Sequence, residues 1–442
     1  MVYKQVDVTS HYTHLPTSFK RFGCEVNRKK SKFERYALFT ATGLLWHPQG
    51  QWSESQRAST GADPPRSNPV RIVLVREIPE DSTFLQRWND LVLEMERPEV
   101  FYRCEWAVAI QAAFRSAFKA PPRPWLFLGH EGDELVGVAS LTADASEQNV
   151  SFLAGTTADY CEFLSPRHRR LEFVEAVLAE LHRLKVSNLV LANLPADSAT
   201  PAALQVAAKK YGFHLYTRPA YFCPQVKLGS MAERQELKTT VMRKRQFRKC
   251  LRAMERQAPV KMAYSRSWEE IQGALPAFIG AHVARFQAVH RVSFLYAPER
   301  RRLLEELGRR FSDAGIVTLS RLMIGDRPVA WSFGFQFCGS WLLYQTTFDT
   351  RDEEYSPGYC VLAKILIEAC GIDALKRVDL GLGSEEYKLW FANGNRQTLH
   401  STLTTSPVQH LREIARYRLA TEVKRFPKLE AAIRNSRARL KL

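Results

Sequence analysis

Residues 355–388, YSPGYCVLAKILIEACGIDALKRVDLGLGSEEYK, contain the pattern from which we predict the fold. Ser356 directly precedes Pro357, and this pair is typical of a helix start, because serine caps the first turn and proline fits its first position. The helix has one apolar face, formed by Leu362, Ile365, Leu366 and Ala369. Gly371 marks its end, and a short strand is predicted over 378–380. A buried helix followed by a strand indicates an α/β fold.

The same order of elements occurs a second time, further upstream. In both copies a β-hairpin, another strand, a Ser-Pro pair, a helix and a last strand follow one another. Gly132 corresponds to Gly325 and Pro166 to Pro357, so that equivalent positions lie about 190 residues apart. The upstream elements are predicted over 125–128, 135–139, 150–153, 174–181 and 189–191, and the downstream ones over 317–319, 329–333, 341–344, 362–369 and 378–380. We interpret this series as a duplicated α/β unit.

The length of 442 residues also favours two domains, because one hydrophobic core rarely extends over so long a chain. We predict a first domain over 71–230, a second over 231–410 and a basic helical tail over 411–442. Residues 1–70 mix His, Ser, Thr, Arg and Pro without periodicity, so we expect a disordered or loosely attached extension there.

The composition is strongly basic, with 63 Lys and Arg against 46 Asp and Glu and a formal charge of +17. This balance favours anionic partners such as nucleotides, phosphorylated cofactors, RNA or a membrane surface. No apolar run reaches the roughly 20 residues that span a bilayer, so integral membrane association is not expected. The eight cysteines are scattered and form no Cys-x-x-Cys pair, which favours reduced thiols in a cytoplasmic protein.

The segment 238–256, between the two copies, predicts a strongly basic helix. Its apolar stripe consists of Val241, Phe247, Leu251 and Met254. Lysine and arginine side chains occupy the remaining surface. Both a solvated helix face and an anion-binding face fit this pattern.

The helix start at Ser356, Pro357 and Gly358 is a candidate cofactor-binding site. Gly358 carries no side chain where the free backbone N–H groups of the first turn point outward, and such a helix start attracts phosphate. An ordinary capped helix that binds nothing fits the same residues. At the equivalent place upstream, residues 165–170 read SPRHRR. Bulky side chains replace the glycine there, which disfavours the first copy as a phosphate site.

Further polar residues gather around the second copy. His282 and Arg285 are three residues apart and share a helix face, so a proton acceptor lies beside a fixed positive charge. Asp379 ends a strand and Lys388 lies in the loop after it, where α/β sheets commonly bind ligands. A core histidine and a surface lysine are the structural alternatives. No metal is predicted, since the chain has no His-Glu-x-x-His motif or close His/Cys cluster.

Together these motifs resemble the C-terminal half of CelD/BcsL-type GNAT acetyltransferases, which are linked to cellulose and exopolysaccharide biosynthesis. The shared order is Asp349, YSPG at 355–358, an apolar helix, and DLGLGSEEYK at 379–388. HVARFQ at 282–287 is similar to the His-x-x-Arg-Trp segment of that family, with Phe286 in place of Trp.

The resemblance covers about residues 75–405 and implies two tandem GNAT-like domains, each with a mixed central sheet flanked by helices. It also implies acetyl-CoA, or another acyl-CoA, as co-substrate, lying between two splayed strands with its pyrophosphate at Ser356–Gly358. This helix start departs from the usual Arg/Gln-x-x-Gly-x-Gly/Ala phosphate loop of GNAT enzymes. Asp159 and Tyr160 are similar to upstream features of the family and are therefore candidate substrate-binding residues.

On the same resemblance, an amine acceptor attacks the thioester after losing a proton to a base, for which His282 and Glu386 are candidates. The acceptor stays open among amino sugars, polysaccharide precursors, amino acids and peptide amines. The candidate catalytic residues are His282, Glu386 and Tyr387, and the further candidate substrate-binding residues are Arg285, Asp379 and Lys388.

Two alternatives to an acyl-CoA enzyme remain. The double GNAT fold is shared by Fem-type aminoacyltransferases, and the positive charge suits the aminoacyl-tRNA that such enzymes use. A non-catalytic, basic nucleic-acid-binding or scaffold protein also fits, because the usual phosphate loop is missing and the segment 238–256 is basic.

Overall fold

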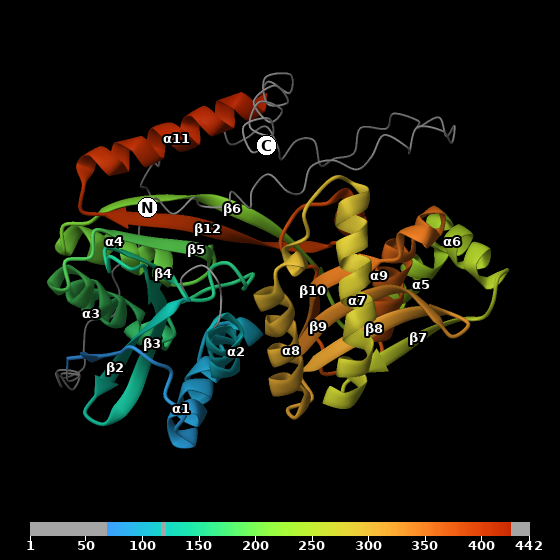
Figure 1. The fold of residues 1–442 in the computed structure, drawn as a ribbon, viewed down its shortest axis with the longest axis horizontal. Coiled ribbons are helices and arrows are strands. Elements are labelled where there is room, and N and C mark those ends of the chain that lie inside the picture. Colours follow the sequence, from blue (N-terminus) through green and yellow to red (C-terminus); the bar gives the residue numbers. More distant parts are fainter. Residues whose placement is uncertain (1–68, 116–120, 426–442) are drawn as a thin grey trace, which may run out of the picture. The chain divides into compact units, whose positions relative to one another are not determined.

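The computed structural model describes residues 69–115 and 121–425 (Figure 1). The described residues all belong to one compact unit that begins at Pro69. The predicted extension over 1–70 lies outside the described residues except for its last two positions. The part of the predicted basic tail beyond residue 425 also lies outside them.

Twelve strands of the described chain form one continuous sheet. Their bounds are β1 Arg71–Val75, β2 Arg123–Glu131, β3 Glu134–Ala143, β4 Asn149–Phe152, β5 Asn188–Pro195, β6 His214–Lys227, β7 Val260–Ser265, β8 Val317–Ile324, β9 Arg327–Phe337, β10 Ser340–Phe348, β11 Arg377–Asp379 and β12 Gly394–Thr404. The spatial order is β1-β2-β3-β4-β5-β12-β6-β11-β10-β9-β8-β7. The pairs β4–β5 and β10–β11 are parallel, and the other neighbours are antiparallel.

The sheet order shows an exchange of strands between the two halves. β6 follows the first copy in sequence but pairs with β11 of the second, whereas β12 follows the second copy but pairs with β5 of the first. β6 and β12 also pair with each other at the centre of the sheet (Figure 1). β12, which belongs to the predicted second domain, thus pairs with a strand of the predicted first domain. The domain boundaries at 230/231 and 410/411 stay a prediction.

Helices cover both faces of the sheet. Their bounds are α1 Ser82–Leu93, α2 Cys104–Phe114, α3 Arg170–Arg183, α4 Thr200–Lys210, α5 Met231–Arg243, α6 Arg245–Glu255, α7 Trp268–Ala288, α8 Pro298–Ser312, α9 Pro357–Ala369, α10 Glu386–Leu389 and α11 Pro407–Arg425. Short 3-10 turns are η4 Val100–Tyr102, η5 Arg167–Arg169, η6 Phe294–Tyr296 and η7 Thr350–Tyr355. In the second half, α7 and α8 lie on one face of β8–β10 and α9 on the other (Figure 1).

Side chains that alternate along the strands divide the hydrophobic core into two clusters. On β10, Leu342 points into the cluster shared with α7, α8 and the first half, whereas Trp341 and Leu343 point into the cluster under α9. α2 packs against α8, and the rings of Trp106 and Phe311 lie 6.3 Å apart. The two halves therefore share the first of these clusters as well as one sheet.

The structure confirms the predicted α/β class and corrects one element. The basic segment 238–256 forms two helices, α5 and α6, because Lys244 leaves the helical conformation with a ψ of 123°. The Nζ of Lys244 donates to the carbonyl of Trp390 at 3.0 Å, which holds the chain at this break. No helix of the described residues is both long and apolar enough to cross a membrane.

Candidate active site

The parallel strands β10 and β11 separate from each other within the second half. Their pairing ends at Leu342 and Asp379. β10 continues to Phe348 with a bulge in its pairing to β9, whereas the chain after Asp379 turns at Gly381, whose φ of 72° favours glycine. Strand ends of this kind bind ligands in α/β sheets, because backbone and side chains meet there without a neighbouring strand.

A loop of the first half, residues 153–164, contacts this end of β10 and β11. The hydroxyl of Tyr344 on β10 donates to the carbonyl of Thr157 at 2.6 Å. The hydroxyl of Tyr160 donates to Oδ2 of Asp379 at 2.8 Å. The candidate site is therefore built by both halves of the chain.

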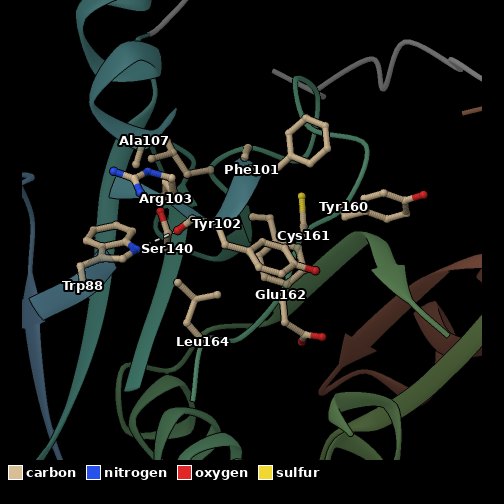
Figure 2. Close-up of a pocket in the computed structure, with 13 residues that line it drawn as sticks. Trp88, Phe101, Tyr102, Arg103, Ala107, Ser140, Tyr160, Cys161, Glu162 and Leu164 are labelled. Atoms are coloured by element: carbon tan, nitrogen blue, oxygen red, sulfur yellow. Dashed lines mark hydrogen bonds between the residues drawn. The ribbon is translucent and has the colours of Figure 1, made fainter. Parts of the chain in front are cut away.

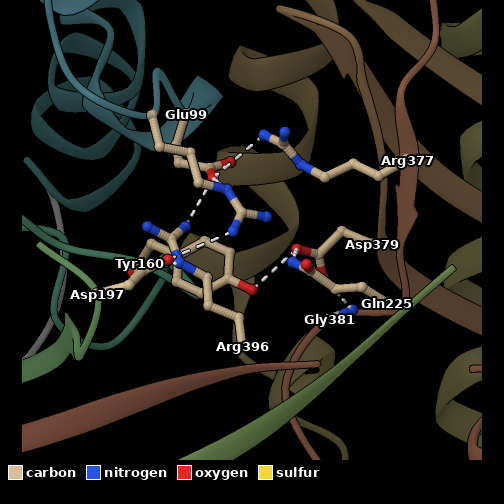
Figure 3. Close-up of polar contacts among 9 residues, drawn as sticks. Glu99, Tyr160, Asp197, Gln225, Arg377, Asp379, Gly381 and Arg396 are labelled. Atoms are coloured by element: carbon tan, nitrogen blue, oxygen red, sulfur yellow. Dashed lines mark hydrogen bonds and ion pairs between the residues drawn. The ribbon is translucent and has the colours of Figure 1, made fainter. Parts of the chain in front are cut away.

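Asp379 is buried and accepts three hydrogen bonds (Figure 3). Besides Tyr160, Gln225 donates to Oδ2 from Nε2 at 2.6 Å, and the backbone N–H of Gly381 donates to Oδ1 at 2.9 Å. Burial raises the pKa of Tyr160 well above its usual value, so its hydroxyl stays protonated and donates. Asp379 thus joins β11, β6 and the first-half loop.

An ion-pair cluster, in which Glu99 and Arg396 are buried, packs against Tyr160 (Figure 3). The guanidinium carbon of Arg396 lies 4.4 Å from the centre of the Tyr160 ring. Arg396 also pairs with Glu99 at 2.7 Å and with Asp197 at 2.9 Å, and Arg377 lies 3.7 Å from Glu99. Burial raises the pKa of Glu99, while Arg396 acts in the opposite direction. The Tyr160 side chain is thus held by Arg396 of β12 at its ring and by Asp379 of β11 at its hydroxyl.

Asp159, next to Tyr160, is a buried carboxyl group with an unusual environment. Burial and the nearby charge of Asp379 raise the pKa of Asp159 to about 7, while Lys388 acts in the opposite direction. Among the described residues, Oδ2 of Asp159 has no hydrogen-bond partner. Lys388 donates from Nζ to the carbonyl of Leu382 at 2.8 Å and lies 3.0 Å from Glu385. Asp159, Asp379 and Lys388, which lie far apart in sequence, therefore meet at one place.

The start of α9 differs from the predicted cap. Ser356 has a left-handed conformation with a φ of 49°, and its side chain makes no capping hydrogen bond, although its carbonyl accepts from the N–H groups of Tyr359 and Cys360. A capping serine ordinarily has an extended backbone conformation instead. Pro357 is the first residue of α9. A Cβ on Gly358 would lie 3.1 Å from Cδ1 of Phe348, so this glycine is needed for the packing of a ring against the helix start.

Arg285 lies beside the same end of β10. Its guanidinium carbon is 4.7 Å from the centre of the Phe348 ring, and Nη1 donates to the carbonyl of Thr346 at 3.3 Å. Since Phe348 also touches Gly358, Arg285 and the start of α9 are neighbours through this ring. The backbone N–H of Gly358 makes no backbone hydrogen bond within the described residues. An arginine and a helix start thus provide two kinds of donor for an anion.

Two of the acidic residues before α9, Asp349 and Asp352, are paired with arginines. Asp352 accepts from Nη2 of Arg327 at 2.9 Å, and Asp349 accepts from Nε of Arg351 at 3.0 Å. These two carboxylates are neutralised, whereas Glu353 and Glu354 in the same turn are exposed. Arg285 and the N–H of Gly358 are the groups that could hold a pyrophosphate here, next to these two exposed carboxylates.

A cysteine pair, Cys250 of α6 and Cys360 of α9, lies at the start of α9 and was not among the predicted site residues. Hydrogen bonding with Cys360, followed by Ser356, lowers the pKa of Cys250 to about 7, although burial acts in the opposite direction. Both thiols are unoxidised and buried. A cysteine side chain of α6 thus interacts with Ser356, which explains in part why this serine does not cap its own helix.

His282 lies in a tightly packed environment on α7. Its Nδ1 is 2.8 Å from Oγ of Ser293, and its ring stacks on Phe286 with a centroid distance of 4.7 Å. Burial, followed by the charge of Arg285, lowers the pKa of His282 to about 3. The ring is therefore neutral near pH 7 and has little affinity for a proton there.

Glu386 and Tyr387 begin the short helix α10. Glu386 is exposed, whereas Tyr387 is half-buried and packs against the core cluster under α9. The structure thus brings Asp159, Tyr160, Asp379 and Lys388 together and Arg285 beside Ser356–Gly358. In the described residues, no group of three or more His, Cys, Asp and Glu side chains could hold a metal ion.

The equivalent helix start in the first half is filled by protein side chains. Residues 167–169 form a 3-10 turn, and α3 begins only at Arg170. The buried guanidinium of Arg170 donates to the carbonyl of Ser165 at 3.1 Å and pairs with Glu162 at 3.5 Å and Glu96 at 3.2 Å. An anion at this place would have to displace Arg170 from two carboxylates.

The space beside β4 in the first half is also small (Figure 2). A cavity of about 30 Å³ lies there, between the helices α1 and α2 and the loop that carries Tyr160 and Glu162. Tyr102, Arg103, Cys161 and Leu164 are among its lining residues. A space of this size holds about one or two water molecules and no acyl donor.

Comparison with known families identifies the second half. Residues 242–389 match the family model for an acetyltransferase (GNAT) domain. This stretch, about a third of the chain, is therefore similar to a GNAT domain. Its match begins in α5 and ends with α10, so it includes the separation of β10 and β11, the start of α9 and Lys388. No curated protein matches the chain.

Solved structures are similar to this chain at low sequence identity. FemX matches with 10% identity and a TM-score of 0.50, over 74% of this chain and 97% of FemX. The C-terminal domain of a protein assigned as lysylphosphatidylglycerol synthetase from Agrobacterium fabrum matches with 9% identity and a TM-score of 0.49, over 75% and 95% of the two chains. A tandem GNAT protein from the clavulanic acid biosynthesis pathway matches with 13% identity and a TM-score of 0.42, over 76% and 99%. The FemX match supports the fold, and the narrower CelD/BcsL assignment stays a prediction.

Two further residues of the candidate site, Gln225 and Thr157, were not predicted from the sequence. Gln225 lies on β6 and reaches Asp379 only because β6 pairs with β11 of the other half. Thr157 contributes only its backbone carbonyl, and this contact does not depend on which side chain occupies position 157. Neither residue has a local signal, since both depend on contacts between distant segments.

Proposed function

We propose that the protein is a cytoplasmic acyltransferase that transfers an acyl group, such as acetyl, from acyl-CoA to an amine or hydroxyl group. The acceptor is a small molecule or a saccharide, in line with the resemblance to enzymes of cellulose and exopolysaccharide biosynthesis. Within the GNAT domain, the acyl thioester would lie where β10 and β11 separate, with its pyrophosphate at Gly358 and Arg285.

The observation that carries this proposal is the meeting of three features at one end of the GNAT domain. The strands β10 and β11 separate there, Arg285 and α9 offer donors for an anion, and Asp159, Asp379 and Lys388 supply charged groups next to them. A thioester donor, its phosphates and a polar acceptor have matching needs.

A titration with acetyl-CoA tests this proposal. We expect acetyl-CoA to raise the melting temperature of the full-length protein with the logarithm of its concentration above the dissociation constant, and S-acetylpantetheine, which lacks the pyrophosphate, to bind more weakly. Release of the CoA thiol is then used to monitor hydrolysis or transfer of the acetyl group. Panels of amino sugars, amino acids and peptides serve as acceptors in this assay. Absence of stabilisation by every acyl-CoA tested would contradict an acyl-CoA enzyme.

A second candidate function uses aminoacyl-tRNA as the donor, and one observation favours it. Arg245, Arg248 and Arg252 on α6 are exposed and have no ion-pair partner within the described residues. They follow one helical stripe, so a phosphate backbone could contact them in succession. Transfer of a labelled amino acid from charged tRNA supports this function, whereas salt-sensitive RNA binding without any transfer indicates a non-catalytic nucleic-acid-binding protein.

A further inference from the structure

Asp159 has the properties of a group whose interactions are incomplete. It is 8% exposed, and Oδ2 has no hydrogen-bond partner among the described residues. A buried carboxylate oxygen without a partner is costly, because water no longer solvates its charge. Such a cost is retained where the group has a role in binding or chemistry.

The loop that carries Asp159 is held in place by contacts from both halves. Arg300 on α8 donates from Nη1 to the carbonyl of Thr156 at 2.9 Å, and Tyr344 donates to the carbonyl of Thr157. On the other side, Asn193 donates from Nδ2 to the carbonyl of Ala158 at 2.8 Å. Three successive carbonyl groups before Asp159 are thus fixed, and the position of its carboxyl group is fixed with them.

The other titratable groups of the site are less suited to accept a proton near pH 7. Asp379 already accepts three hydrogen bonds. His282 has a pKa of about 3, and Glu386 is exposed on α10. The charged groups that face Asp159 are Asp379 and Lys388 of the second half and Glu99 of the first. The two carboxylates oppose its ionisation and the lysine favours it.

We propose that Asp159, a residue of the first half, accepts the proton that the acceptor loses in the reaction of the GNAT domain. This inference rests on the proposed acyl transfer. The acceptor nitrogen attacks the carbonyl carbon of the thioester, so that a C–N bond forms and the C–S bond breaks. Oδ2 of Asp159 takes the proton from nitrogen, the CoA thiolate takes a proton from solvent, and Asp159 later releases its own to solvent.

Gly381 sets the geometry of this contact. A Cβ on Gly381 would lie 3.1 Å from Oδ2 of Asp159 and 3.2 Å from the carbonyl of Leu343. Gly381 therefore lies directly beside the unpartnered oxygen, and a larger residue at this position would crowd it. The proposed role requires the segment 380–384, which has positive φ angles at Gly381 and Gly383, to move aside so that an acceptor reaches Oδ2.

The test compares Asp159→Asn with the wild-type protein in acyl transfer from acetyl-CoA to the best amine acceptor, as a function of pH. For the wild type, we expect kcat/KM to rise with pH, with a midpoint near 7, and to level off above it. Asp159→Asn should lose at least 100-fold in kcat together with this pH dependence, while acetyl-CoA binding stays within twofold of wild type. Asp133→Asn, an exposed aspartate at the β2–β3 turn, is the matched control and should keep both.

Asp159→Glu provides a second variant that retains a carboxylate. It should transfer the acyl group more slowly than the wild type, but its kcat/KM should still rise with pH. This variant keeps the proposal testable if Asp159→Asn does not fold. An unchanged pH profile in Asp159→Asn, or a raised acceptor KM with unchanged kcat, overturns the proton-acceptor role. A wild-type protein that transfers no acyl group to any acceptor contradicts the proposed function instead, so the two failures are distinguishable.

Discussion

The two halves of the molecule use the same helix start in opposite ways. In the second half, Pro357 opens α9 directly, and Gly358 allows the Phe348 ring and Arg285 to gather beside it. In the first half, Arg170 lies across the start of α3 and is bound to Glu162 and Glu96. The helix start of the second half thus carries a ring and an arginine, whereas that of the first half is filled with ion pairs.

The first half contributes to the site in another way. Its loop 153–164 reaches the separated ends of β10 and β11, where Tyr160 and Thr157 bond to the GNAT domain. Because α2 and α8 share a core, this contact is rigidly supported. Under the proposed function, the first half thus has no donor site of its own but completes the candidate site of the second half.

The largest expected effect concerns the filled helix start of the first half. Arg170→Met leaves the buried carboxylate of Glu162 without its charged partner and removes the ion pair with the exposed Glu96, which should lower the free energy of unfolding by about 3–5 kcal/mol. Chemical denaturation measures this loss. Arg167→Ala, whose side chain is 71% exposed, is the control and should change stability by less than about 0.5 kcal/mol. Equal effects of both substitutions would show that Arg170 does not hold this helix start.

The next effect concerns the bond between the halves. Tyr160→Phe removes one of the three donors to buried Asp379 and should lower the free energy of unfolding by about 1–3 kcal/mol. It should also reduce acyl transfer, since Asp379 and the neighbouring loop lose a fixed contact. Tyr216→Phe is the control, because that hydroxyl has no hydrogen bond within the described residues. An unaltered Tyr160→Phe protein would argue against a shared site.

A smaller effect is expected for the open helix start of the second half. Arg285→Ala removes the guanidinium beside Phe348 and should weaken acetyl-CoA binding about tenfold, which corresponds to about 1.4 kcal/mol. Isothermal titration calorimetry measures the affinity. Arg167→Ala, at the start of the first-half helix, should leave this affinity within twofold. The account fails if the first-half arginine has the greater effect.

The last expected effect is a gradual one, a difference in pH dependence between the halves. Asp159 in the first half has a raised pKa of about 7 against 3.8 unfolded, so its contribution to stability is present below 3.8 and is lost as pH rises through 7. His282 in the second half has a lowered pKa of about 3 against 6.5 unfolded, so its contribution is present above 6.5 and is lost as pH falls towards 3.

Unfolding free energies of Asp159→Asn and His282→Asn, measured from pH 4 to 7, test these opposite signs. Relative to the wild type, Asp159→Asn should gain stability with rising pH and His282→Asn should lose it, each by about 1 kcal/mol per pH unit. Parallel curves for the wild type and both variants would contradict the assigned pKa directions.

Local patterns in the sequence were sufficient for much of the fold. The apolar face of α9 and the Ser-Pro start of both helices are periodic or contiguous signals, so they predict the duplicated α/β unit and the contrast between Gly358 and residues 167–170. The exchange of β6 and β12 has no such signal, because strand pairing between distant segments depends on the whole sheet.

The site was predictable only where its residues carry a motif. Asp379 and Lys388 belong to the DLGLGSEEYK segment, and Asp159 and Tyr160 were found only by their resemblance to a family. The burial of His282 against Phe286 and Ser293 is a tertiary effect, and it changes the proton affinity that the residue type alone suggests. The contact of Cys250 with Ser356 depends likewise on the packing of α6 against α9.

The central claim is that the second half binds the acyl donor and the first half does not. Amide hydrogen exchange of the full-length protein with and without saturating acetyl-CoA tests this claim directly. We predict slower exchange at the end of β10 and the start of α9, residues 345–361, and in the segment 380–390. Exchange at the start of α3, residues 165–172, should not change. Protection at α3 without protection at α9 would contradict the account.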